Sequence, residues 1–168
     1  KKRYKIKEDE IVISTLPISI VSRILGKKNN LKFRGICSVY LFYNKRNILP
    51  KKHHWLYFDS ERLLFNRITE NKKLSKFVAP KNKSYLTAEI TYTQGDKFSK
   101  TDPKEIIRKV KEQISLTGLI DDKKLIDAQI NYEPFVYPVQ FSDYKNEIVR
   151  IKSFVESFDN LFSIGAGG

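Results

Sequence analysis

The chain has 168 residues, which is enough for one domain with a real hydrophobic core, or for one domain and part of a second. Apolar residues make up 40% and charged residues 30%, so collagen-like and disordered classes are excluded. The single cysteine, Cys37, excludes an internal disulfide and a cysteine-based zinc site, and it favours a reducing compartment. The longest apolar stretch, residues 11–22, is too short to span a bilayer.

Lysine and arginine outnumber acidic residues by 32 to 19, a net charge of +13. A basic domain can bind nucleic acid through its phosphates. However, lysines dominate, they cluster in pairs at expected turns, and no segment has the aromatic and glycine pattern of an RNA-binding strand. We therefore expect a solvated, lysine-rich surface and no specific nucleic-acid site. Attraction of an anionic small molecule is compatible with this charge.

The N-terminal part of the chain predicts a strand, a tight turn and a short helix. Residues 3–14 alternate and then become continuously apolar, which suits a hairpin arm that leads into a buried strand. The helix is expected to have Ser14 or Thr15 as its cap and Pro17 in its first turn. It should end at Gly26.

Four strands are expected next, at residues 35–44, 54–58, 64–69 and 85–93. The first is apolar on both faces and should therefore be internal to a sheet. The last alternates, with one face formed by Leu86, Ala88, Ile90 and Tyr92. Because the connections are short and polar, these strands most naturally pair in antiparallel fashion.

Two longer helices close the predicted fold. The first spans residues 103–117, with Asp102 as its cap, Pro103 in its first turn and Glu105 completing a capping box. After it come a strand at 125–132, a proline-stiffened extended segment at 133–138, a helix at 143–158 capped by Ser142, and a strand at 161–164. This order predicts an α+β fold: a mixed, mainly antiparallel sheet of about five to six strands with two long flanking helices.

The sequence shows no self-sufficient catalytic constellation. His53 and His54 are adjacent, so on a strand they face opposite sides and cannot easily share a metal or a nucleophile. Cys37 lies in the most apolar strand, which favours a buried thiol. There is no phosphate-binding glycine loop and no nucleophile-elbow motif. Since the chain contains no methionine, we interpret it as a fragment of a larger protein.

Several segments, taken in order, resemble one enzyme superfamily. They are EIVISTLPI (10–18), KFRGI (32–36), VYLF (39–42), HWLYF (54–58), FNRITE (65–70), AEIT (88–91), YPV (137–139) and NLFSIG (160–165). Together they resemble the amine-oxidase-like FAD flavoproteins, which include protoporphyrinogen oxidase, phytoene desaturase, monoamine oxidase and UDP-galactopyranose mutase. The segments after the first resemble the bacterial protoporphyrinogen-oxidase-like branch. The N-terminal dinucleotide fingerprint of that superfamily is missing from these residues.

The resemblance implies the substrate-binding portion of a two-domain FAD-dependent oxidoreductase, which orients a small-molecule substrate against the flavin for hydride transfer. It implies a segment at 1–30 that re-enters the FAD domain, a substrate-binding sheet domain at 31–140 that includes helix 103–117, and a segment at 141–168 that leads back. The partner is then the missing FAD domain of the same chain, and the fragment alone should neither hold FAD nor be active. A UDP-sugar mutase-like flavoenzyme, and a basic non-catalytic module for nucleic acid or an acidic partner, are the alternatives.

The resemblance also suggests two groups of site residues. Cofactor contacts are expected from Ser14, Thr15, Leu16, Pro17, Gly165, Gly167 and Gly168. Substrate contacts are expected from Phe65, Arg67, Tyr137 and Trp55. On a strand at 64–69, Arg67 would share a face with Phe65 and could bind an anionic group of the substrate through its planar guanidinium. No metal ligand set is expected.

Ordinary structural roles stay open for each of these residues. Ser14 and Thr15 can serve as helix caps, and the terminal glycines can form a flexible end. Arg67 can form an ion pair with Glu89 or Glu70, and Tyr137 can belong to the core. We expect a cytoplasmic location, with attachment to a membrane surface left open.

Overall fold

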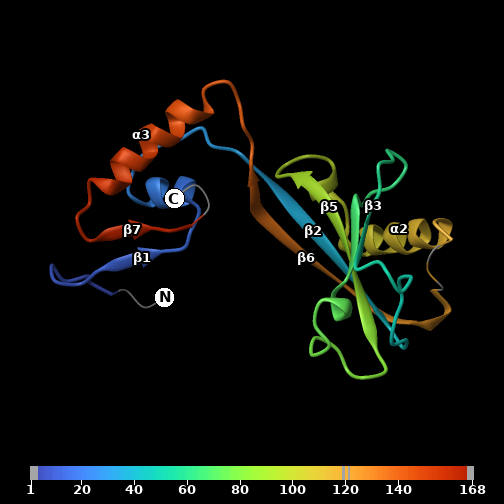
Figure 1. Ribbon diagram of the computed structural model, residues 1–168. Helices are drawn as coiled ribbons and strands as arrows, with labels where there is room; N and C mark the ends of the chain where they lie inside the picture. Colours follow the sequence, from blue (N-terminus) through green and yellow to red (C-terminus); the bar gives the residue numbers. More distant parts are fainter. Residues whose placement is uncertain (1–3, 119, 121, 166–168) are drawn as a thin grey trace. The chain divides into compact units, whose positions relative to one another are not determined.

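The computed structural model of the chain describes residues 4–118, 120 and 122–165, and its contacts divide it into two compact units (Figure 1). The first unit combines the two ends of the chain, Lys1–Arg34 and Phe135–Gly168. The second unit is the continuous segment Gly35–Pro134. Three α-helices, a two-stranded sheet and a five-stranded sheet are present in the described residues, so the predicted α+β class is confirmed.

The five-stranded sheet is the main feature of the continuous unit (Figure 1). Its strands are β2 (Phe33–Tyr43), β3 (Trp55–Tyr57), β4 (Arg67–Glu70), β5 (Ser84–Thr93) and β6 (Leu125–Pro138), in the order β3-β4-β5-β2-β6. β3 pairs with β4, and β4 with β5, in antiparallel fashion. β2 is internal, as its apolar pattern predicts, and the predicted mainly antiparallel sheet is confirmed.

Helix α2 (Pro103–Leu116) shares one hydrophobic core with this sheet. The helix contributes Ile106, Val110 and Ile114. β5 contributes Leu86, Ala88, Ile90 and Tyr92, the face that its alternation predicts. Asp102 caps the helix as expected, accepting a hydrogen bond from the Lys104 amide at 3.0 Å. Glu105 does not close the expected capping box; its carboxylate binds Arg108 instead.

Two predicted boundaries in this unit differ from the structure. β4 begins at Arg67 and not at residue 64, because the Leu64 amide donates to Gln113 of α2 at 2.8 Å and Phe65 turns into the core. Residues 125–138 form one 14-residue strand, where the sequence predicts a strand followed by a separate extended segment. Short 3-10 helices lie at Asn71–Lys73, Phe98–Lys100 and Asp122–Lys124.

The unit formed by the chain ends contains helix α1 (Ile18–Ile24), helix α3 (Tyr144–Glu156), and a parallel pair of β1 (Val12–Ser14) and β7 (Leu161–Ser163). Two predictions are wrong here. Residues 4–11 form no hairpin arm, and β1 instead pairs with β7. Neither helix has a side-chain cap, since Pro17 and Asp143 occupy the N-cap positions where Ser14, Thr15 and Ser142 were expected to act.

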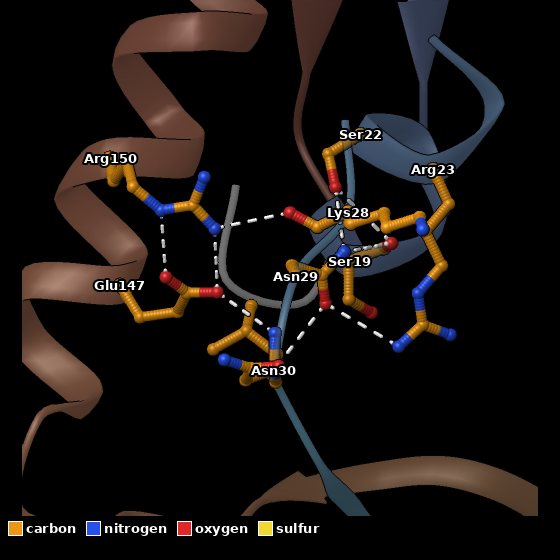
Figure 2. Close-up of polar contacts among 9 residues, drawn as sticks. Ser19, Ser22, Arg23, Lys28, Asn29, Asn30, Glu147 and Arg150 are labelled. Atoms are coloured by element: carbon orange, nitrogen blue, oxygen red, sulfur yellow. Dashed lines mark hydrogen bonds and ion pairs between the residues drawn. The ribbon is translucent and has the colours of Figure 1, made fainter. Parts of the chain in front are cut away.

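A polar network joins the loop after α1 to α3 (Figure 2). Glu147 of α3, which is buried, accepts hydrogen bonds from the Asn30 amide and from Arg150, both at 2.8 Å. Arg150 also donates to the Lys28 carbonyl. These bonds lower the pKa of Glu147, with the Arg150 contact the largest cause. The Asn29 amide group donates to the Ser19 carbonyl and the Ser22 hydroxyl, so the loop is held on two sides.

Candidate functional site

The face of the five-stranded sheet that points away from the core is aromatic and rich in hydroxyl groups. We call it the open face and define it by Tyr40, Phe42, Trp55, Tyr57, Arg67, Thr69, Tyr85, Glu89 and Thr91. These side chains are half-buried or exposed, whereas their strand neighbours lie in the core. The alternation of β-strand side chains explains the difference between the two faces.

Two rows of the open face are fixed by strand register. Trp55 lies opposite Thr69, and Tyr57 lies opposite Arg67, which in turn lies opposite Glu89. Further along the sheet, the Tyr85 ring contacts Tyr40 and Phe42, with centroids 6.2 Å and 5.7 Å apart. The face therefore presents flat aromatic surfaces beside one charged pair.

Arg67 is held by its neighbours on the open face. Its guanidinium lies 2.5 Å from the Glu89 carboxylate, donates to the Tyr57 hydroxyl at 3.1 Å and stacks over the Tyr57 ring. The hydrogen bond to Glu89, followed by the one to Tyr57, raises the pKa of Arg67. The ion pair with Glu89 is the structural alternative that the sequence left open. About a third of the Arg67 side chain, 32%, is still exposed.

The other predicted substrate contacts are dispersed. Trp55 shares the open face with Arg67, and 48% of it is exposed. Phe65 is only 1% exposed and packs edge-on against Phe58 in the core, so the prediction that it shares a face with Arg67 is wrong. The reason is that β4 starts at Arg67, and strand alternation does not extend back to Phe65. Tyr137 is half exposed at the end of β6, in the other unit.

A pocket of about 290 Å³ continues the open face at one end of the sheet. Phe42 and Tyr85 form its sheet side, and Val78, Pro80 and Ile126 are among the residues of its rim. Tyr40, Phe42 and Tyr85 are not among the site residues predicted from the sequence. The signal that would have found them is the run of aromatic residues on the second face of two neighbouring internal strands.

The predicted cofactor residues do come together at the end of the parallel pair β1–β7. The Ile164 amide donates to the Ser14 carbonyl at 2.9 Å, and the Ser14 hydroxyl accepts from the Leu16 amide. Gly165 lies against the turn so closely that a Cβ on it would be 2.1 Å from the Leu16 carbonyl oxygen. Residues 14–17 and Gly165 thus form one backbone junction, whereas Gly167 and Gly168 lie outside the described residues.

This junction fits one side of a cofactor site. The Ser163 hydroxyl is buried and has no hydrogen-bond partner among the described residues. A pocket of about 350 Å³ opens beside it, lined by residues of β7, α3 and α1. The junction contains no phosphate-binding glycine loop, so it does not form a complete dinucleotide site. In the described part of the chain, no group of three or more potential metal ligands lies together.

Comparisons with known proteins show where this architecture recurs. No protein-family model matches the sequence, and no curated protein matches it. Similar solved structures include reduced UDP-galactopyranose mutase, with a TM-score of 0.73 and 17% identity over 91% of this chain. They also include a putative protoporphyrinogen oxidase from Exiguobacterium sp. 255-15, with a TM-score of 0.68 and 14% identity over 94% of this chain. This chain shares their fold.

Both structures carry names from the superfamily that the sequence resembles, so the fold that the resemblance implies is confirmed. The likeness extends over both units of this chain. The likeness covers a smaller share of the other two proteins: this chain spans 34% of the mutase chain and 37% of the putative oxidase chain. No helix in the described residues combines the length and the apolar character needed to cross a membrane.

Proposed function

We propose that this chain is the substrate-binding portion of an FAD-dependent oxidoreductase and that it works in the cytoplasm. The observation that supports this proposal is the fold, which matches a flavoprotein mutase and a putative oxidase over more than nine-tenths of the chain. FAD, when bound, would accept a hydride from the substrate. The protein residues would bind and orient that substrate and exclude water from it. The presence of a single cysteine, the buried Cys37, supports the cytoplasmic location, because disulfide-dependent proteins are typical of oxidising compartments.

The open face is the proposed substrate surface. Tyr85, Tyr40 and Trp55 offer flat apolar area for a planar or ring-containing substrate. Arg67, positioned by Glu89 and Tyr57, would offer the exposed edge of its guanidinium to a polar or anionic substrate group. Tyr137 belongs to the other unit and is not part of this proposed surface.

The backbone junction is the proposed cofactor surface. Ser14, Thr15, Leu16 and Pro17 would contribute backbone atoms, and Gly165 permits close approach because it lacks a side chain. The Ser163 hydroxyl, unpartnered among the described residues, would gain a hydrogen-bond partner. The remaining FAD contacts would come from an FAD domain of the same polypeptide, which is the proposed partner of this chain.

A UDP-sugar mutase-like reaction is the second candidate, favoured by the likeness to UDP-galactopyranose mutase. A diphosphate needs several cations near it. On the open face, Arg67 is already balanced by Glu89. We therefore rank oxidoreductase chemistry first.

The test is a spectrum and two assays on the full-length gene product. We expect it to purify with flavin absorbance and to release FAD on denaturation, whereas the isolated 168-residue chain should be colourless. Flavin reduction or oxygen consumption with protoporphyrinogen supports an oxidase, and interconversion of UDP-galactopyranose supports a mutase. A full-length product without bound flavin would overturn both proposed functions, the oxidoreductase and the mutase.

In the same protein, Trp55→Ala and Tyr85→Ala should slow reduction of the flavin by substrate without releasing FAD. Leu116→Ala is the matched control, because Leu116 is 83% exposed at the end of α2 and lies outside the open face. If all three variants behave alike, the open face is not the substrate surface.

A further inference from the structure

Much of the positive charge of the chain is concentrated in two loops of the continuous unit. Residues 44–54 carry four lysines or arginines, residues 71–83 carry five, and neither loop contains an aspartate or glutamate. The first loop follows β2 and the second precedes β5, which are neighbouring strands in the sheet. Both loops therefore lie at one end of the sheet (Figure 1).

The two loops are tied together by a buried charged pair. Glu70, fully buried at the end of β4, accepts hydrogen bonds from the Ile48 and Leu49 amides at 2.9 Å. Lys73 lies 3.4 Å from Glu70 and donates to the carbonyls of Leu49, Pro50 and His53. The loop at 44–54 is thus anchored to the start of the loop at 71–83.

A second lysine shapes the loop at 71–83 itself. The Lys72 ammonium group donates to the carbonyls of Pro80, Lys81 and Lys83. This contact draws residues 80–83 back towards the start of the loop. Residues 74–79 form the tip of the loop between the two ends that Lys72 joins.

The tip of this loop exposes apolar side chains. Phe77 is 86% exposed, Leu74 56% and Val78 46%. The same two loops carry six exposed cations: Arg46, Lys51, Lys52, Lys76, Lys81 and Lys83. The Lys76 ammonium group lies 5.1 Å from the centre of the Phe77 ring. We call this surface the basic-apolar tip.

We propose that the basic-apolar tip attaches the protein to the surface of an anionic lipid membrane. Interfacial binding requires apolar side chains that can enter the acyl boundary and cations that contact the headgroups. The tip supplies both: three exposed apolar side chains in one loop, and six exposed cations with no acidic residue in either loop. Aromatic rings such as Phe77 add apolar area at the depth where headgroups meet acyl chains.

The combination of exposed cations with exposed apolar side chains favours a membrane over the other anionic partners. An acidic protein groove would also match the positive charge, but it would have to bury Leu74, Phe77 and Val78 against a defined set of side chains. A lipid surface accepts exposed apolar side chains without such a fixed complement. Nucleic acid would use the cations and leave Leu74 and Val78 without a role, because bases stack on aromatic rings. The attachment does not depend on the proposed flavin chemistry.

The experiment is sedimentation of the full-length protein with vesicles. The probes are vesicles of phosphatidylcholine alone, vesicles of phosphatidylcholine with one-fifth phosphatidylserine, and a poly-dT oligonucleotide. We expect binding to the phosphatidylserine vesicles that is at least about tenfold stronger than to phosphatidylcholine alone, since each lysine near an anionic surface contributes about fivefold. Raising the salt concentration should weaken this binding.

Two variants separate the apolar and charged contributions. Leu74→Ser with Phe77→Ser and Val78→Ser should reduce vesicle binding by about tenfold or more, because the buried apolar area is removed. Lys76→Ser with Lys81→Ser should reduce it by roughly tenfold or more at low salt. The matched controls are Leu116→Ser, at an equally exposed apolar residue, and Lys97→Ser with Lys104→Ser, at exposed lysines outside the two loops. Neither control should change binding.

Three results would overturn the proposal. The first is absence of binding to phosphatidylserine vesicles. The second is vesicle binding that the apolar triple variant does not change. The third is binding of poly-dT that exceeds vesicle binding at the same salt concentration, which would assign the loops to nucleic acid. A soluble partner protein, in contrast, would leave the vesicles without bound protein and so falls under the first result.

Discussion

The Arg67 guanidinium and the Glu89 carboxylate lie 2.5 Å apart on directly opposed residues of β4 and β5. Tyr57 on β3 adds a hydrogen bond to the same guanidinium, so one side chain links three strands. Both members of the pair are partly exposed, and solvent screens their attraction. The pair therefore contributes mainly by fixing the geometry of the open face.

Replacing Arg67 by lysine tests this arrangement. Lysine keeps the charge but cannot bind Glu89 and Tyr57 together, so we expect the free energy of unfolding to fall by about 1 kcal/mol. Under the proposed function, substrate affinity should also fall by roughly tenfold, from the loss of one charge-assisted hydrogen bond. Urea titration and substrate titration on one full-length sample measure both quantities. Lower stability with unchanged affinity would remove Arg67 from the proposed site.

Glu70→Gln should destabilise the protein more strongly. Glutamine has one side-chain oxygen that can accept and an NH2 group that can only donate, so either the Ile48 or the Leu49 amide loses its acceptor. Lys73 also loses its counter-charge. We expect a loss of about 2–4 kcal/mol in urea denaturation, as for other broken buried pairs. Glu112→Gln is the control, because Glu112 forms its ion pair with Arg108 on the exposed side of α2. Equal effects of the two variants would contradict the anchoring role of Glu70.

Gly165→Ala should disturb the junction of β1 and β7. The new methyl group would meet the Leu16 carbonyl oxygen at 2.1 Å, so the end of β7 must move away from the turn. We expect a destabilisation of about 1–3 kcal/mol. Hydrogen exchange at the Val12 and Ile164 amides measures it locally, because both amides are bonded within the junction.

Ser163→Ala is the companion variant at this junction. It removes a buried hydroxyl that has no partner among the described residues, so exchange at the same amides should stay slow. Weaker retention of FAD in this variant would place Ser163 at the cofactor surface. Faster exchange in Ser163→Ala than in Gly165→Ala would be inconsistent with the close backbone approach.

Cys37 should make stability depend on pH in the alkaline range. Burial raises the pKa of its thiol to about 12, although a hydrogen bond with Tyr132 acts in the opposite direction. Above the ordinary thiol value of 9.0, the unfolded chain loses this proton while the folded chain keeps it. The free energy of unfolding should therefore decrease as pH rises from about 9, with a slope of up to about 1.4 kcal/mol per unit.

Cys37→Ala should reduce this slope, although Tyr92 and Tyr132, whose pKa values are also raised by burial, still contribute in the same direction. A thiol reagent should label Cys37 only in denaturant, since the folded protein holds it as a buried thiol. Rapid labelling of the folded protein at neutral pH would show that β2 opens or that Cys37 is accessible.

Local patterns were sufficient to predict α2 and β5. Asp102, Pro103 and the apolar repeat of α2 act within a single helix, and the alternation of β5 places Leu86, Ala88 and Ile90 in the core as expected. The start of β4 could not be predicted in the same way. It depends on Gln113, 49 positions beyond Leu64, whose carbonyl accepts the Leu64 amide and turns Phe65 inward.

The arrangement of the candidate site residues also depends on contacts between segments that are far apart in the sequence. Ser14–Pro17 and Gly165 come together because the parallel register of β1 and β7 places Ser14 opposite Ser163. The open face could not be predicted without the register of three strands. No local sequence pattern shows that Tyr57, Arg67 and Glu89 lie in one row across β3, β4 and β5. The prediction of a hairpin arm at residues 3–14 was wrong because β1 pairs with β7, the last strand.

That pairing of the first and last strands constrains the order in which the protein can fold. Val12 and Leu161 are aligned in register, so the parallel pair closes a loop that contains the whole continuous unit, Gly35–Pro134. Closing a loop of this length carries a large entropic penalty unless the intervening chain is already compact. On the ribosome, the continuous unit is complete before β7 is made. We expect it to form first and to act as a folded insertion that brings the two ends within reach, so that the junction of β1 and β7 is the last part of the molecule to assemble.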